Sequence, residues 1–189
     1  EEIDIPSGVS TIGSNAFYNC SGLTTITLPS AINRIDNSTF AFCKKLTKTI
    51  VPNNVSSIGN YAFAYCDVLS QVIMTENVRE IENDSFIGCG TLTIYGPVGS
   101  YVQRYSDENE IPFELTSIFV KGDFKYSILE DGTVEITEYL GTSGNVEIPS
   151  QVEDLTGSMR KVTRIGRSVF ENNLRLTSVT IPNGVTQIG

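Results

Sequence analysis

Hydrophobic residues return at a fixed spacing of 23 residues along the first half of the chain. Five apolar columns keep this step over four successive units: Phe17, Phe40, Phe63 and Phe86; Cys20, Cys43, Cys66 and Cys89; Leu23, Leu46, Leu69 and Leu92; Ile12, Ile35, Ile58 and Ile81; and Val9, Ile32, Val55 and Val78. Columns in register are typical of a solenoid, because stacked coils bury together an apolar face that no single coil could bury.

Each unit is predicted to contain one short strand and one turn. In the first unit, Ile26 and Leu28 alternate with threonines, which predicts a strand that faces the core on one side. Pro29 ends this strand, because proline has no amide hydrogen to donate to a ladder. The stretch from Phe17 to Cys20 predicts one helical or 3-10 turn. Stacked coils would then place successive strands about 4.8 Å apart.

The cysteine column is predicted to hold four free, buried thiols. A zinc tetrahedron brings its sulfurs within about 4 Å of one another, whereas the first and fourth of these coils would lie roughly 14 Å apart. A disulfide between neighbouring coils is the alternative, although stacked side chains keep their Cβ atoms farther apart than a disulfide prefers. The same column holds Asn173 in a later repeat. Cys and Asn can both serve as buried donors, but Asn cannot form a disulfide.

The unit LxxIxLPxxVxxIGxxAFxxCxxL resembles the surface-antigen (BspA-like) leucine-rich repeat of bacterial and some protozoan proteins. The resemblance covers residues 3–96 and 162–189. It implies a leucine-rich repeat solenoid, an α/β superhelix rich in strand with short helical or 3-10 turns, built from 23-residue repeats and interrupted by a capping helix and a β-hairpin. The chain departs from the general leucine-rich pattern at Ala31 and Asn54, where that pattern expects Asn or Cys.

The regular spacing ends after Leu92. Residues 100–109 are predicted to form a helix, with Tyr101 and Tyr105 on one face, that closes the open end of the first array. Residues 124–139 alternate apolar and polar positions around a Glu-Asp-Gly turn, which predicts a β-hairpin.

The repeat then resumes out of phase, since Phe170 stands 84 residues after Phe86 and 84 is not a multiple of 23. We therefore expect a second module with its own hairpin cap. The predicted divisions are residues 1–96 for the first array, 97–117 for the capping helix and loop, 118–150 for the hairpin and strand cap of the second module, and 151–189 for the start of the second array.

Composition and charge favour a protein without catalytic activity. The 189 residues include no histidine and carry a net charge of −9, so neither a Ser-His-Asp nor a Cys-His nucleophile can be built. No phosphate loop, calcium loop or dinucleotide motif occurs. Carboxylate pairs such as Glu80 with Glu82 lie on an expected solenoid flank, whereas acid–base catalysis needs carboxyls that converge in a cleft. We expect no enzyme activity, no cofactor and no metal.

The evenly spread acidity also argues against nucleic acid as a partner. The local exception is a set of basic residues, Arg160, Lys161, Arg164, Arg167 and Arg175, which ordinary solvation also explains. No apolar run is long enough to insert into a membrane. The chain opens within the repeat pattern, at EEIDIPSGV, and is interpreted as a processed or trimmed piece.

Outward positions of the strands form the candidate binding surface. One predicted row contains Glu2, Thr25, Lys48 and Gln71, and the next contains Asp4, Thr27, Ile50 and Ile73. Thr49 takes the inward position beside Ile50. Adjacent exposed isoleucines can mark a contact patch, although a strand surface also tolerates β-branched residues. The candidate binding residues are Thr25, Thr27, Lys48, Ile50, Gln71 and Ile73. The structural ladder comprises Phe17, Phe40, Phe63, Phe86, Phe170, Cys20, Cys43, Cys66, Cys89 and Asn173.

These observations predict a non-catalytic binding module whose strand face engages a protein or a glycan. The family resemblance implies a secreted or cell-surface location and adhesion to host or bacterial macromolecules. Two alternatives are a targeting appendage of a larger secreted enzyme and a structural stalk.

Overall fold

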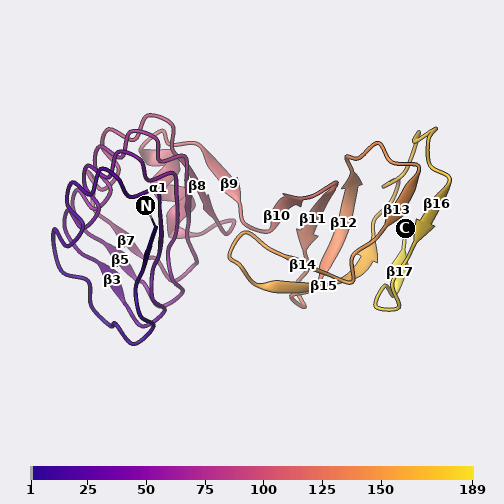
Figure 1. The fold of residues 1–189 in the computed structure, drawn as a ribbon, viewed down its shortest axis with the longest axis horizontal. Helices are drawn as coiled ribbons and strands as arrows, with labels where there is room; N and C mark the ends of the chain where they lie inside the picture. Colours follow the sequence, from indigo (N-terminus) through magenta and orange to yellow (C-terminus); the bar gives the residue numbers. More distant parts are fainter. Residues whose placement is uncertain (1) are drawn as a thin grey trace. The chain divides into compact units, whose positions relative to one another are not determined.

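The computed structural model describes residues 2–189. The chain divides into two compact units, with the boundary between Leu115 and Thr116. We refer to residues 2–115 as unit 1 and to residues 116–189 as unit 2, and each is described by itself (Figure 1).

Unit 1 is a solenoid of stacked coils (Figure 1). Its long sheet contains six parallel strands in the order β1 (Glu2–Asp4), β2 (Thr25–Thr27), β4 (Lys48–Ile50), β6 (Gln71–Ile73), β8 (Thr93–Gly96) and β9 (Phe113–Leu115). Its short sheet contains β3 (Arg34–Ile35), β5 (Ser57–Ile58) and β7 (Glu80–Ile81), also in parallel. The predicted leucine-rich repeat solenoid is confirmed.

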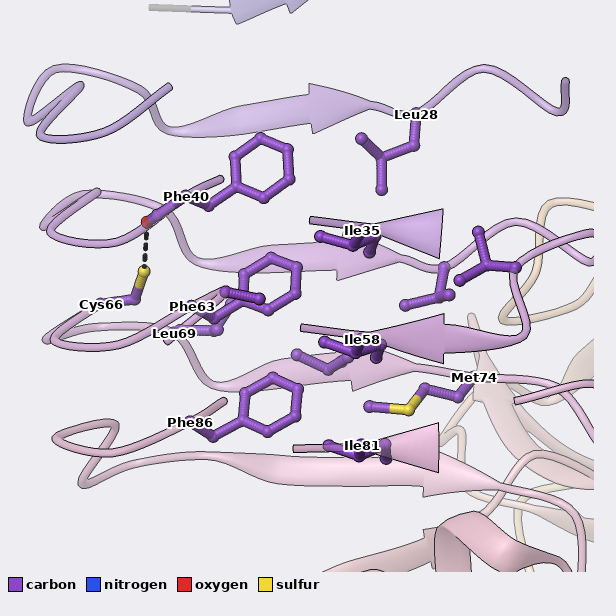
Figure 2. Packing of buried hydrophobic residues seen from close by; sticks show 14 of the residues in the cluster. Leu28, Ile35, Phe40, Ile58, Phe63, Cys66, Leu69, Met74, Ile81 and Phe86 are labelled. Atoms are coloured by element: carbon purple, nitrogen blue, oxygen red, sulfur yellow. Dashed lines mark hydrogen bonds between the residues drawn. The ribbon is translucent and has the colours of Figure 1, made fainter. Parts of the chain in front are cut away.

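The core of unit 1 is built from the predicted columns. Neighbouring rings of Phe17, Phe40, Phe63 and Phe86 stack with centroids 5.2–5.4 Å apart, and Figure 2 shows three of them one above another. Phe40 and Phe63 are fully buried, whereas Phe17 in the first coil is half-buried. Stacking therefore buries the inner coils more completely than the first one.

The segment between each phenylalanine and cysteine is not a helical or 3-10 turn, so that expectation was wrong. Asn15 and Asn19 on either side of Phe17 have left-handed φ angles of 61° and 57°. The Phe17 amide donates to the Thr39 carbonyl of the next coil at 2.9 Å, whereas the Ala16 amide donates three residues back. Alternate amides thus point along the stack, an arrangement that a helical turn, with all its amides directed along the chain, cannot provide.

The single helix of the described residues, α1 (Tyr101–Glu108), covers the last coil of unit 1. The Ser100 side chain caps its start by accepting from the Gln103 amide at 3.3 Å. The Tyr105 ring meets Phe86 edge to face, with centroids 6.4 Å apart. The predicted capping helix is therefore present and continues the phenylalanine stack.

Unit 2 contains a five-strand path in the order β10 (Ile118–Lys121), β11 (Phe124–Ile128), β12 (Val134–Tyr139), β15 (Met159–Ile165) and β14 (Gln151–Glu153). The predicted hairpin is the antiparallel pair of β11 and β12. Parallel pairing joins β13 (Asn145–Glu147) to β16 (Ser178–Thr180) and β15 to β17 (Gln187–Ile188). Phe170 packs here against Tyr139, with centroids 5.5 Å apart, and so belongs to a different core from the other ladder phenylalanines.

Candidate functional site: the long-sheet face

The outward residues of the long sheet form two rows in register. Lys48 pairs with Thr25 on one side and with Gln71 on the other, and Gln71 pairs with Thr93. The second row places Ile73 between Ile50 and Tyr95. Parallel pairing in register therefore brings together side chains that are far apart in the sequence, which creates a regular surface.

The candidate binding residues differ in exposure. Thr25 and Thr27 are exposed, and Lys48, Ile50 and Gln71 are half-buried. Ile73 is only 1% exposed, so its prediction as an exposed contact residue was wrong. A strict 23-residue step would have placed Gly96 beside Ile73, but the register advances by 22 residues there and places Tyr95 in the row. Ile73 is thus held between two large neighbours.

Thr49 faces the core and Ile50 faces outward, as the sequence predicts. Thr49 is 1% exposed, in the inward column that also contains Val72. Its hydroxyl has no hydrogen-bond partner within residues 2–189. The strand register is therefore kept at the expense of one unsatisfied buried hydroxyl.

The cysteine thiols contribute to the stack rather than to a reactive site. All four cysteines are free. Each thiol of the later coils donates to the carbonyl of a phenylalanine in the preceding coil: Cys43 to Phe17 at 3.2 Å, Cys66 to Phe40 at 3.2 Å and Cys89 to Phe63 at 3.1 Å (Figure 2). Burial raises the pKa of Cys43 to about 11. The thiol therefore stays protonated at neutral pH and serves as a donor.

Asn173 does not repeat this bond. It is half-buried, and its side-chain oxygen accepts from the Arg175 amide at 3.2 Å. The expectation that Asn173 acts as a buried donor does not describe this hydrogen bond, because the amide oxygen instead satisfies a local backbone group.

A second surface, which the sequence analysis missed, lies on the turns of unit 1. The rings of Tyr18, Phe42 and Tyr65 follow one another with centroids 5.4 and 4.9 Å apart. Tyr18 is 50% exposed, and Tyr61 and Tyr65 are each 40% exposed. We call Tyr18, Phe42, Tyr61 and Tyr65 the turn-edge aromatics.

Three of these aromatics occupy a strained backbone conformation. Phe42, Tyr61 and Tyr65 have φ angles of 62°, 57° and 56°, where bulky residues are uncommon. The positions equivalent to Phe42 in other coils hold Asn19 and Gly88, which tolerate this region better. Ring stacking offsets part of the strain in Phe42 and Tyr65. An aromatic residue in a column that otherwise holds Asn or Gly was the available sequence signal.

The described residues offer few alternatives to a binding surface. Within residues 2–189, no three His, Cys, Asp or Glu side chains gather as the ligands of a metal ion would. The same part of the chain contains no helix of the length and apolar character needed to cross a membrane.

The fold and its columns define a leucine-rich repeat protein. The chain belongs to the family described as the BspA type leucine rich repeat region, whose model matches six copies over residues 1–104 and 144–189. A search of the curated proteins found no match.

Several solved bacterial structures are similar. The Treponema pallidum leucine rich repeat protein TpLRR is 16% identical, with 99% of this chain and 72% of that chain covered and a TM-score of 0.45. A leucine rich cell surface protein of Faecalibacterium prausnitzii is 23% identical, with 100% and 56% covered and a TM-score of 0.33. The pneumococcal vaccine antigen PcpA is 17% identical, with 97% and 51% covered and a TM-score of 0.41. The chain therefore spans between about half and three quarters of the length of these proteins.

Proposed function

We propose that the chain is a non-catalytic binding module that holds a protein or glycan ligand on its long-sheet face. The observation that carries the proposal is the register of outward side chains across β2, β4, β6 and β8. Membership of the BspA-type family and the names of similar bacterial proteins support a secreted or cell-surface location.

The two rows complement each other chemically. Thr25, Lys48, Gln71 and Thr93 supply hydrogen-bonding groups in one line. Ile50 and Tyr95 supply half-buried apolar surface in the next line. A contact patch typically combines an apolar centre with a polar rim. The rows therefore offer both parts side by side.

Ile73 supports this surface without reaching a ligand. It lies between Ile50 and Tyr95 in the sheet register and is almost fully buried. Its packing limits the rotamers that its neighbours can adopt. Rigid contact residues lose less conformational entropy on binding, so the arrangement favours affinity.

The test compares two charge-matched variants on an array of extracellular-matrix proteins and bacterial and host glycans. Lys48→Glu with Ile50→Asp alters the long-sheet face, and Lys45→Glu with Ile87→Asp makes the same changes at exposed positions on the turns. We expect the first variant to weaken binding at least tenfold, or about 1.4 kcal/mol. The second should bind like the parent protein.

Equal affinities for the two variants would place the ligand elsewhere. A parent protein that retains nothing on the array would contradict the binding module and favour a structural stalk. Circular dichroism of both variants controls for folding, because outward substitutions should change stability little.

A further inference from the structure

A cleft of about 500 Å³ opens on unit 2, and the proposed function does not use it. The β10–β11 hairpin lines one side with residues 121–124 and Tyr126. Residues of β13, β14 and their connection line the other side, together with Met159. Phe124, Tyr126 and Val152 contribute buried apolar side chains to the lining. The volume lies within the usual range of roughly 300–1,000 Å³ for ligand pockets.

The two strands that contribute to opposite sides of this cleft are edge strands. β10 and β14 stand at the two ends of the five-strand path, and each has one paired neighbour in it. An edge strand presents a row of backbone N–H and C=O groups that no strand of its own sheet satisfies. Such an edge can accept an extended peptide as an added strand.

The charges around the cleft are mainly negative. Its lining contains the carboxylates of Asp123, Glu147 and Glu153 and the ammonium group of Lys121. Lys121 Nζ lies 3.0 Å from Glu153 Oε2, so these two charges offset each other. Among the ion pairs of residues 2–189, none includes Asp123 or Glu147. Two carboxylates therefore remain beside an apolar lining without a cation.

This combination fits a long cationic side chain. Lysine and arginine place an apolar stem against apolar surface and keep their charged head in a polar environment. The aromatic lining suits the stem, and the two free carboxylates suit the ammonium or guanidinium group. A neutral or acidic side chain would leave these carboxylates without compensation.

We propose that the cleft between β10 and β14 binds an extended peptide segment of a partner protein, with a lysine or arginine side chain inserted beside Asp123 and Glu147. The peptide backbone pairs with the free edge of β14. Glu153 stays paired with Lys121 and keeps the two edge strands together. This site is in unit 2, so its test is independent of the long-sheet face.

The probe is a fluorescein-labelled peptide with blocked ends, in which one lysine stands among valine, threonine and serine residues. Fluorescence anisotropy measures its affinity for the whole chain. We expect binding that weakens as salt is added. Replacing the lysine by norleucine, which keeps the stem and removes the charge, should weaken binding at least about tenfold. N-methylation of alternate peptide amides should also abolish binding, because it removes the donors of the added strand.

The matched variants change the same charge at different places. Asp123→Asn with Glu147→Gln removes the free carboxylates and should weaken peptide binding at least about tenfold. Glu130→Gln with Glu171→Gln removes two exposed carboxylates outside the cleft and should leave affinity unchanged. Equal losses in both variants would reveal only long-range attraction and overturn the proposal.

Three further outcomes would also overturn it: no binding of the lysine peptide, equal binding of the norleucine peptide, or undiminished binding of the N-methylated peptide. Sedimentation of the chain alone covers the remaining occupant. A dimer that the Asp123→Asn and Glu147→Gln variant dissociates would show that a second copy, not a foreign peptide, fills the cleft.

Discussion

Replacement of Thr49 by valine should stabilise unit 1. Valine has nearly the same shape as threonine, and it replaces the only hydroxyl that lacks a partner among the buried side chains of residues 2–189. A buried polar group without a partner costs about 1–3 kcal/mol. Because valine fills the same space beside Val72, no new cavity opens. We therefore expect the free energy of unfolding to rise by about 1 kcal/mol, at the low end of that range.

Thr39 provides a control with the opposite sign. It is also fully buried, but its hydroxyl donates to the Asp36 carbonyl at 2.8 Å. Thr39→Val removes that bond and should lower the free energy of unfolding by about 1 kcal/mol. Urea denaturation followed by circular dichroism measures both variants. If Thr49→Val destabilises the protein as much as Thr39→Val does, the Thr49 hydroxyl has a partner and the inward assignment of its environment is incorrect.

Three other predictions concern the stack of unit 1. Phe63→Ala should lower the free energy of unfolding by about 3–5 kcal/mol, and Phe17→Ala should cost clearly less because Phe17 is half-buried; equal losses in urea denaturation would contradict the graded burial. Gly88→Ala should cost at least about 1–2 kcal/mol through its left-handed backbone, since φ is 78° and a Cβ would lie 2.5 Å from the Tyr65 ring, whereas Gly90→Ala meets nothing within 4 Å and should be nearly neutral. Burial raises the pKa of Cys43 from 9.0 to about 11, so its contribution to stability is complete below pH 9 and declines as pH rises toward 11. Urea titrations across this range should show a smaller decline for Cys43→Ala than for the parent, and identical declines would rule out this linkage.

Much of unit 1 followed from its sequence because the columns report stacking directly. Phe40 and Phe63 occupy equivalent places in successive coils, and the same spacing predicts their contact. The capping helix was predictable for a different reason, since Tyr105 and its neighbours form an apolar helix face next to the end of the array.

The errors arose where backbone geometry or register departs from the repeat. A phenylalanine or tyrosine gives no sign of a left-handed backbone, so the turns near Phe42 and Tyr65 were read as helical. The burial of Ile73 depends on a one-residue shortening that brings Tyr95 beside it. In unit 2, the cleft depends on strand order, which places β10 and β14 at the two edges of the path although they are separated in sequence by the hairpin.

The most direct test of the binding face is hydroxyl-radical footprinting of the chain with and without the ligand that the array identifies. Ile50 and Tyr95 lie on the long-sheet face, and Tyr18, Tyr61 and Tyr65 lie on the turns. We predict that bound ligand reduces oxidation of Ile50 and Tyr95 and leaves the three turn tyrosines unchanged. Protection of the turn tyrosines, with Ile50 and Tyr95 still oxidised, would contradict the assignment of the ligand to the long-sheet face.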